Sequence, residues 1–177
     1  NSINSGRVVH ASAGNGLSLD GKSIDTSKNR KLDANSLITL PGFFYRRYKF
    51  SNDFLPLSGE LRMGGSIAYE MLMVALNISQ YAVISSAYMW DISGGLAIIN
   101  ESNCSALKIN INNNETHWSK IDTLVEEWDL GETKLSDLRS RTNPMLIAPT
   151  NYINELKNKI SRKRNPIKQL VNGIFNS

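Results

Sequence analysis

Gly64 to Glu101 reads GGSIAYEMLMVALNISQYAVISSAYMWDISGGLAIINE, and this stretch decides the fold. From Ile67 to Ala75, apolar residues recur at the three- and four-residue spacing of a helix that buries one face. The run from Tyr81 to Ile84 is apolar, as is typical of a buried strand, and a second helical pattern follows Trp90. The sequence therefore predicts a helix ending near Asn77, a strand and a second helix.

Asp91 stands at the start of the second predicted helix. An aspartate there can accept hydrogen bonds from free backbone N–H groups and complement the helix dipole, so a helix cap is the plain structural interpretation. The neighbouring residues favour a functional interpretation of Asp91 instead. Arg62 and Gly65-Ser66 precede the first helix, and Trp90-Asp91 opens a second helix that contains glycines.

This arrangement resembles the C-terminal half of the inositol monophosphatase family, which comprises magnesium-dependent phosphatases related to fructose-1,6-bisphosphatase. The resemblance covers roughly residues 6 to 160. It implies that Asp91 supplies a carboxylate to a catalytic Mg²⁺ ion. It also implies that Gly65, Ser66 and Ile67 approach the substrate at the first helix's N-terminus, where free N–H groups favour an anion. The plain alternative there is an ordinary helix start with Ser66 near the cap.

The chemistry implied by the resemblance is hydrolysis of a phosphate monoester, for which metal ions activate a water and stabilise phosphoryl charge. Such a site needs several carboxylates, because magnesium takes about six oxygen ligands. In the family these come from an upstream Glu and an Asp-Pro-x-Asp-Gly-Thr/Ser motif. This chain lacks that motif, since Asp20-Gly21-Lys22-Ser23 has no preceding Pro and Asp. We therefore expect the C-terminal part of a phosphatase that begins just after its main metal motif, and no activity from this chain alone.

The expected ligand is a small phosphorylated metabolite. Inositol-specific members of the family place a Glu seven residues before the metal-binding Asp, where it holds a sugar hydroxyl, and this sequence has Ile84 there. Because isoleucine cannot accept a hydrogen bond, inositol phosphate itself is in doubt. The sequence does not choose among sugar, inositol and nucleotide phosphates as the ligand. A rival of another class is a degenerate, non-catalytic paralogue that serves as a binding module.

The predicted fold is α/β: a mixed sheet layered with helices, as in the C-terminal half of the family's αβαβα sandwich. Residues 1–40 are expected to be the terminal strands of a preceding N-terminal domain, 41–160 the C-terminal α/β domain, and 161–177 a basic amphipathic tail. The first 40 residues predict short strands and tight turns. These are strands at Arg7–Ala11, Leu17–Leu19 and Asn35–Leu40, with turns at Gly14–Gly16 and Asp20-Gly21.

Aromatic and basic residues alternate from Phe43 to Phe54. We favour an amphipathic helix whose aromatic side chains pack while Arg46, Arg47 and Lys49 stay in solvent. The alternative is a surface that stacks nucleic-acid bases and holds phosphates. Nucleic acid is the less favoured partner.

The C-terminal third predicts two strands and two helices before the tail. The strands are Ala106–Ile111 and Met145–Ala148, and the helices are Thr116–Leu138 and about Asn151–Ile160. The carboxylates at 126, 127 and 129 fit a solvated helix face better than a metal cluster. In the tail, a basic run at 161–164 precedes a short apolar helical face. We favour packing of this face on its own domain or on a second subunit in a homodimer over binding to an anionic membrane.

The composition is that of a globular protein. The 177 residues are 41% hydrophobic and 20% charged, with a net charge of +4 that is compatible with a phosphate ligand. Cys104 is the single cysteine, so no internal disulfide forms, and the two histidines give no zinc-site spacing. No apolar run reaches the ~18 residues of a membrane span. We expect a soluble, cytoplasmic protein.

Overall fold

The computed structural model describes residues 6–26, 30–112, 115–121, 139 and 141–163. Four helices and one 3₁₀ turn lie in this part: α1 (Phe44–Arg47), α2 (Ile67–Ala75), α3 (Met89–Asn100), α4 (Ile153–Lys159) and η1 (Leu55–Leu57). The strands there are β1 (Val9–Ala11), β2 (Leu17–Leu19), β3 (Lys22–Ile24), β4 (Leu37–Thr39), β5 (Tyr48–Phe50), β6 (Glu60–Arg62), β7 (Ser79–Ile84), β8 (Cys104–Asn112), β9 (Glu115–Lys120), β10 (Met145–Pro149) and β11 (Ile160–Arg162).

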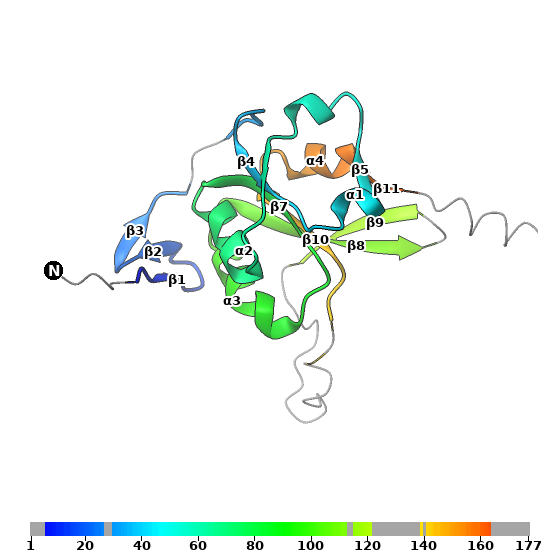
Figure 1. Ribbon diagram of the computed structural model, residues 1–177. Coiled ribbons are helices and arrows are strands. Elements are labelled where there is room, and N and C mark those ends of the chain that lie inside the picture. Colours follow the sequence, from blue (N-terminus) through cyan, green and yellow to red (C-terminus); the bar gives the residue numbers. More distant parts are fainter. Residues whose placement is uncertain (1–5, 27–29, 113–114, 122–138, 140, 164–177) are drawn as a thin grey trace, which may run out of the picture.

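A six-stranded sheet in the order β6-β4-β7-β10-β8-β9 forms the centre of the molecule (Figure 1). β4 is parallel to both β6 and β7, whereas β10, β8 and β9 are joined by antiparallel pairing. β7 and β10 are buried along their whole length, as their apolar sequences require. The predicted mixed α/β sheet is therefore confirmed.

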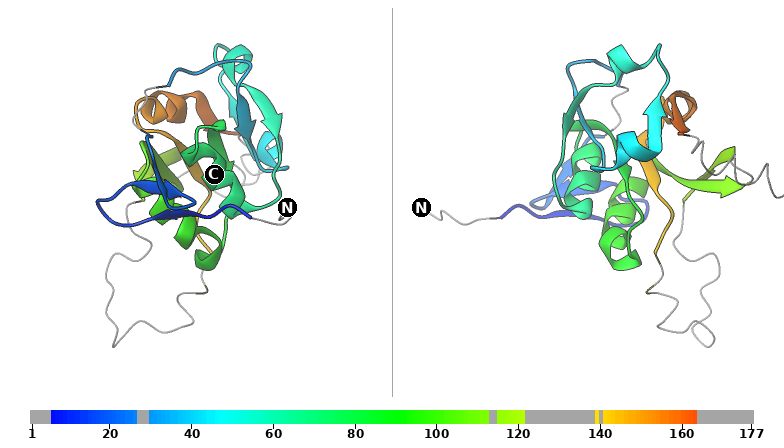
Figure 2. Two further views of the ribbon diagram at one scale, coloured as in Figure 1. Left: turned by 90° about the vertical axis from the view of Figure 1, so that its left-hand side faces the viewer. Right: turned by 45° about the vertical axis from the view of Figure 1, so that its right-hand side comes forward.

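The two faces of this sheet are covered by different elements. Figures 1 and 2 show α2 and α3 on one face, with the β1-β2-β3 sheet beside them. The other face carries α1, α4 and the two-stranded ribbon of β5 and β11. Each face has its own cluster of buried side chains, one centred on residues such as Met71 and Ile92, the other on residues such as Phe44 and Tyr81.

Apart from the stretch of residues 43–54, the structure confirms the elements predicted between residues 7 and 100. α2, β7 and α3 lie where the apolar spacing placed them, and the N-terminal strands and turns are also present. At the turn between β2 and β3, Asp20 and Gly21 have φ angles of 52° and 77°, as a type I′ turn requires. β4 is hydrogen-bonded to β6 and β7. The domain boundary at residue 40 stays a prediction.

The helix predicted over residues 43–54 is wrong in length. α1 has only four residues, and the chain then becomes β5, where buried Tyr48 and Phe50 flank exposed Lys49. This alternation is the period of a strand, and pairing with β11 stabilises it. Most of the aromatic side chains nevertheless pack in or against the core, with Tyr45, 47% exposed, as the exception. Arg46, Arg47 and Lys49 are exposed.

The helix predicted from Thr116 to Leu138 is wrong at its start, because residues 116–120 belong to β9, paired along its length with β8. Residues 122–138, including the carboxylates at 126, 127 and 129, lie outside the described residues. The predicted tail helix also lies outside them, although the first residues of the tail form the end of β11. Among the described helices, none is long and apolar enough to cross a membrane.

Candidate functional site

The N-termini of α2 and α3 lie at the same edge of the six-stranded sheet. β6, β4 and β7 are parallel, so their carboxyl ends share this edge. α2 begins shortly after β6 ends, and α3 begins shortly after β7 ends. The carboxyl edge of parallel strands is where α/β proteins commonly bind ligands, and helix N-termini there favour anions. This topology brings the segments of Gly65 and Asp91 to one edge.

Asp91 lies in the first turn of α3, where it is partly buried. Its Oδ2 atom accepts the backbone N–H of Tyr88 at 3.2 Å, and its own N–H donates to the Tyr88 carbonyl at 3.0 Å. Tyr88, not Asp91, is the N-cap residue, so the cap interpretation needs correction: Asp91 reaches back from the third helical position. The bond from the Tyr88 N–H therefore orients the carboxylate, and the backbone bond closes the first turn of the helix.

The start of α2 is held by its own side chains. Ser66 is the N-cap residue, and its Oγ accepts the N–H of Tyr69 at 3.4 Å. Gly65 has a φ of 74°, which turns the chain into the helix. Glu70 Oε1 accepts the N–H groups of Gly64 and Gly65 at 3.0 and 3.1 Å. Gly65 and Ser66 are exposed and Ile67 is half-buried, so this loop is open to solvent.

Glu70 is a site residue that sequence reasoning missed. Burial raises the pKa of its carboxyl, and the hydrogen bonds from Gly64 and Gly65 oppose that rise. Its position gave a signal, because a carboxylate in the first turn of a helix can bind free N–H groups. Glu70 therefore holds the loop that the resemblance assigns to the substrate.

A stack of three side chains lies beside Asp91. The rings of Tyr88 and Trp90 are parallel within 11°, with centroids 4.5 Å apart, and the Arg141 guanidinium lies 4.6 Å from the Tyr88 ring centroid. Arg141 also donates to the Tyr88 hydroxyl at 3.2 Å. Trp90 is 59% exposed, so the stack forms part of the surface at the α3 N-terminus. Sequence reasoning missed it because Arg141 follows Tyr88 by 53 positions.

The model of the inositol monophosphatase family matches residues 3–143. The chain belongs to this family. Solved structures with the same fold include inositol monophosphatase II from Staphylococcus aureus MSSA476, with 20% identity, a TM-score of 0.58, and coverage of 86% of this chain and 50% of that one. Another is SaIMPase-II with bound inositol monophosphate, with 20% identity, a TM-score of 0.59, and coverage of 86% of this chain and 52% of that one.

A third member of the family's fold is an IMPase/NADP phosphatase complexed with Mg²⁺ and phosphate. Its identity is 16% and its TM-score 0.51, with 81% of this chain and 46% of that chain covered. The present chain therefore spans about half the length of these solved structures. No curated protein matches it.

The described residues alone do not fit a complete magnesium site. Among them, no group of three or more His, Cys, Asp or Glu side chains is placed to hold a metal ion. Magnesium takes about six oxygen ligands, some of them waters, and catalytic sites use more than one protein carboxylate. In a magnesium site at this edge, Asp91 would be one ligand, and the others would have to come from outside the described residues.

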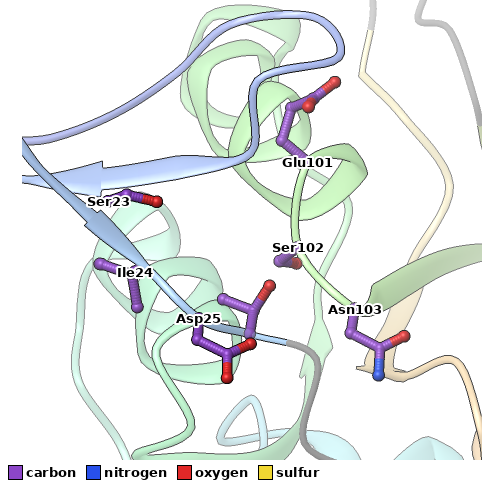
Figure 3. Close-up of a pocket in the computed structure, with 7 residues that line it drawn as sticks. Ser23, Ile24, Asp25, Glu101, Ser102 and Asn103 are labelled. Atoms are coloured by element: carbon purple, nitrogen blue, oxygen red, sulfur yellow. The ribbon is translucent and has the colours of Figure 1, made fainter.

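A cavity of about 710 Å³ lies between β3 and the C-terminal end of α3, away from Asp91 (Figure 3). It contains two carboxylates, Asp25 and Glu101. Glu101 accepts the N–H groups of Gly14 and Gly16 at 3.1 and 3.0 Å, and Figure 3 shows its side chain pointing away from Asp25. These carboxylates therefore do not converge, and Glu101 instead fastens the turn between β1 and β2 to α3.

Proposed function

We propose that this chain is the C-terminal part of a magnesium-dependent phosphatase that hydrolyses small phosphate monoesters. In this proposal Asp91 is a metal ligand, and Gly65, Ser66 and Ile67 approach the substrate. The observation that carries it is the placement of the α2 and α3 N-termini at one carboxyl edge of the sheet. Because α/β proteins commonly bind ligands at this edge, a metal-bound carboxylate and a phosphate could meet there.

Residues of α2 and α3 would have separate roles at that edge. The N–H of Tyr88 orients the Asp91 carboxylate at 3.2 Å. The exposed N-terminus of α2 offers partial positive charge to the phosphate. Bound Mg²⁺ would activate a water and stabilise negative charge on the phosphoryl oxygens.

The substrate class is a small phosphorylated metabolite, with sugar, inositol and nucleotide phosphates open. Similar solved structures hold inositol monophosphate in one case and Mg²⁺ with phosphate in another. In this chain Ile84 is 1% exposed and lies in the core, so it supplies no acceptor for a substrate hydroxyl. A reducing compartment such as the cytoplasm is part of the proposal, supported by the buried Cys104, which forms no disulfide.

The metal-ligand role of Asp91 can be tested without catalysis. In a protein that joins this chain to the family's upstream metal motif, Mn²⁺, a paramagnetic substitute for Mg²⁺, should broaden the amide NMR signals around Asp91 and Gly65. Asp91→Asn should weaken the binding of Mn²⁺, so that a higher Mn²⁺ concentration is needed for the same broadening. Glu155→Gln is a matched control, because Glu155 is also an acidic first-turn residue but belongs to α4 on the other face of the sheet. Broadening that Asp91→Asn leaves unchanged would show that Asp91 is a structural residue only.

Activity gives the second test. We expect the 177-residue chain to hydrolyse no phosphate ester in a magnesium-dependent way. In a protein that joins it to the family's upstream metal motif, Asp91→Asn should lower kcat by about 100-fold or more, since a metal ligand is worth several kcal/mol to the transition state. The cost in stability should stay within the about 0.5 to 2 kcal/mol of a lost cap. Activity retained within a few fold at saturating Mg²⁺ would show that Asp91 is a structural residue and not a metal ligand.

A further inference from the structure

Two basic segments from distant parts of the sequence meet on the face of the sheet that α2 and α3 do not cover. β5 and β11 lie side by side in Figure 1. They pair antiparallel, and Arg162 is the register partner of Tyr48. The N–H of Lys163 donates to the carbonyl of Arg47 at 2.8 Å, and Lys163 Nζ donates to the carbonyl of Tyr45, 118 positions earlier. The aromatic-basic stretch and the basic start of the tail therefore form one positively charged surface.

A cavity of about 300 Å³ opens within this surface. Arg47 and Arg162 line it together with Asn110 and Asn143, and the buried ring of Tyr48 contributes to its wall. Its volume is at the lower end of the ~300–1,000 Å³ typical of small-molecule sites. Tyr48 belongs to the core cluster on the α1 and α4 side of the sheet, so the cavity is separate from the Asp91 edge of α3.

The two arginines are available to a ligand. Ion pairs hold Arg7, Arg62 and Lys159 in the described part of the chain, whereas Arg47 and Arg162 make none with a described carboxylate. The Arg47 guanidinium lies over the Phe43 ring, 4.9 Å from its centroid, which leaves its N–H edge for hydrogen bonding. Burial raises the pKa of Tyr48, and the charges of Arg162 and Arg47 oppose that rise. Both guanidinium groups are therefore close enough to Tyr48 to affect its hydroxyl.

The two asparagines add directed donors. Asn143 Nδ2 donates to Asn110 Oδ1 at 3.0 Å, and Asn110 Nδ2 donates to Ser119 Oγ at 2.8 Å. Each of these amide groups uses one N–H in those bonds and carries a second. Two guanidinium groups and two amides thus surround one small space, a set of donors that suits the several acceptor oxygens of a phosphate.

We propose that this cavity binds the phosphate group of a small anion through Arg47 and Arg162, assisted by Asn110 and Asn143. A single-stranded nucleic acid fits the surface less well. Base stacking over several nucleotides needs several exposed rings. Phe44, Tyr48 and Phe50 are 1%, 3% and 4% exposed, and Tyr45, at 47%, is the only exposed ring between residues 43 and 50. The site would allow a phosphorylated metabolite, or inorganic phosphate itself, to bind on the face opposite the helices of the proposed catalytic edge.

The test uses inorganic phosphate as the probe, with the full chain in EDTA so that no metal-dependent binding contributes. Amide NMR shifts locate the site in the wild-type chain, and titration gives the Kd of each variant. Arg47→Gln and Arg162→Gln each remove one proposed donor. Lys49→Gln is the matched control: Lys49 pairs with Ser161, one position along from the pair of Tyr48 and Arg162, so it points to the opposite side of the ribbon.

We expect phosphate to shift the amides of Arg47, Arg162 and Asn110 and to raise the melting temperature. Each arginine variant should weaken binding about tenfold, the value of one charge-assisted hydrogen bond, whereas Lys49→Gln should change it less than twofold. Equal losses in all three variants would show diffuse charge attraction and overturn the proposal. So would the absence of amide shifts in the wild-type chain, or steeply salt-dependent oligonucleotide binding that Lys49→Gln weakens equally.

Discussion

The two faces of the six-stranded sheet are built in contrasting ways. The face under α2 and α3 is aliphatic, and most of its buried cluster comes from the single stretch between residues 71 and 106. The opposite face is aromatic, with six buried rings: Phe44, Tyr48, Phe50, Phe54, Tyr81 and Tyr152. Its elements are short and come from residues 38 to 160. One face therefore depends on regular helices with local periodicity, and the other on long-range pairing of short segments.

Truncating one buried side chain on each face gives the largest expected effect on stability. Phe44 is 1% exposed, and its ring centroid lies 4.9 Å from that of Phe50 and 5.7 Å from that of Tyr48. Phe44→Ala should cost about 3 to 5 kcal/mol, because it removes a large apolar group and its ring pairs. Ile92→Ala on the aliphatic face should cost about 2 to 4 kcal/mol.

Urea unfolding of both variants measures this difference. Ile92 is 0% exposed, so burial alone does not distinguish the two positions. A cost for Phe44→Ala that is equal to or below that of Ile92→Ala would mean that the aromatic contacts add nothing to the area buried.

Adding a methyl group at one glycine on each side of the sheet tests how easily the surrounding side chains can move. Gly59 has a φ of 101°, and a Cβ there would lie 2.6 Å from Ile38 Cγ2 and 2.7 Å from the Ser36 carbonyl oxygen. Gly59→Ala should therefore cost about 3 kcal/mol or more, from backbone strain and overpacking together. Gly95 lies in α3, where a Cβ would lie 2.5 Å from the Sδ atom of Met71.

Gly95→Ala should change stability by about 1 kcal/mol or less. The end of the Met71 side chain can move, and alanine gains about 1 kcal/mol over glycine in helix propensity. Thermal unfolding of the two variants side by side decides the point. A loss at Gly95 as large as that at Gly59 would show that α2 and α3 pack as rigidly as the loop before β6.

The same contrast explains what the sequence could predict. The helical spacing of Ile67 to Ala75 and the buried run of β7 are local, so they placed Asp91 correctly at the start of a helix after a strand. The stretch from Phe43 to Phe54 contains a strand whose partner, β11, lies more than a hundred positions later. The helix predicted there rested on an amphipathic interpretation and on the family resemblance, and the distant strand pairing prevailed over it.

The candidate site shows the same division. The positions of Gly65, Ser66 and Asp91 follow from helix-start signals, although their roles stay proposals. Arg141 reaches Tyr88 across 53 positions through a bridge between short extended segments, and no local pattern indicates that contact. Likewise, the cavity of Arg47 and Arg162 exists only because β5 and β11 pair.

The smallest expected effect concerns an exposed ion pair on the aromatic face, where Lys159 at the end of α4 donates to Asp53. The hydrogen bond from Lys159 is the main cause that lowers the pKa of Asp53 to about 2. An unfolded aspartate titrates near pH ~3.9. The folded value is the lower one, so this pair stabilises the fold above about pH 4, and its contribution disappears as the pH falls toward 2.

Carbon NMR titration of the Asp53 carboxyl measures this pKa directly. Lys159→Gln should raise it most of the way to the ordinary value, because Lys159 is the main cause of the shift. Asp20 beside the β1–β2 pair is the matched comparison. The largest single cause that lowers its pKa is the backbone N–H of Val8, which Arg7→Gln leaves in place, so the pKa of Asp20 should stay below its ordinary value in that variant. The two substitutions remove one cation each, but only Lys159→Gln should abolish the pH dependence between 4 and 2 that Asp53 gives the wild type. If the Asp53 titration were unchanged by Lys159→Gln, the ion pair between α4 and the loop after β5 would not exist in solution.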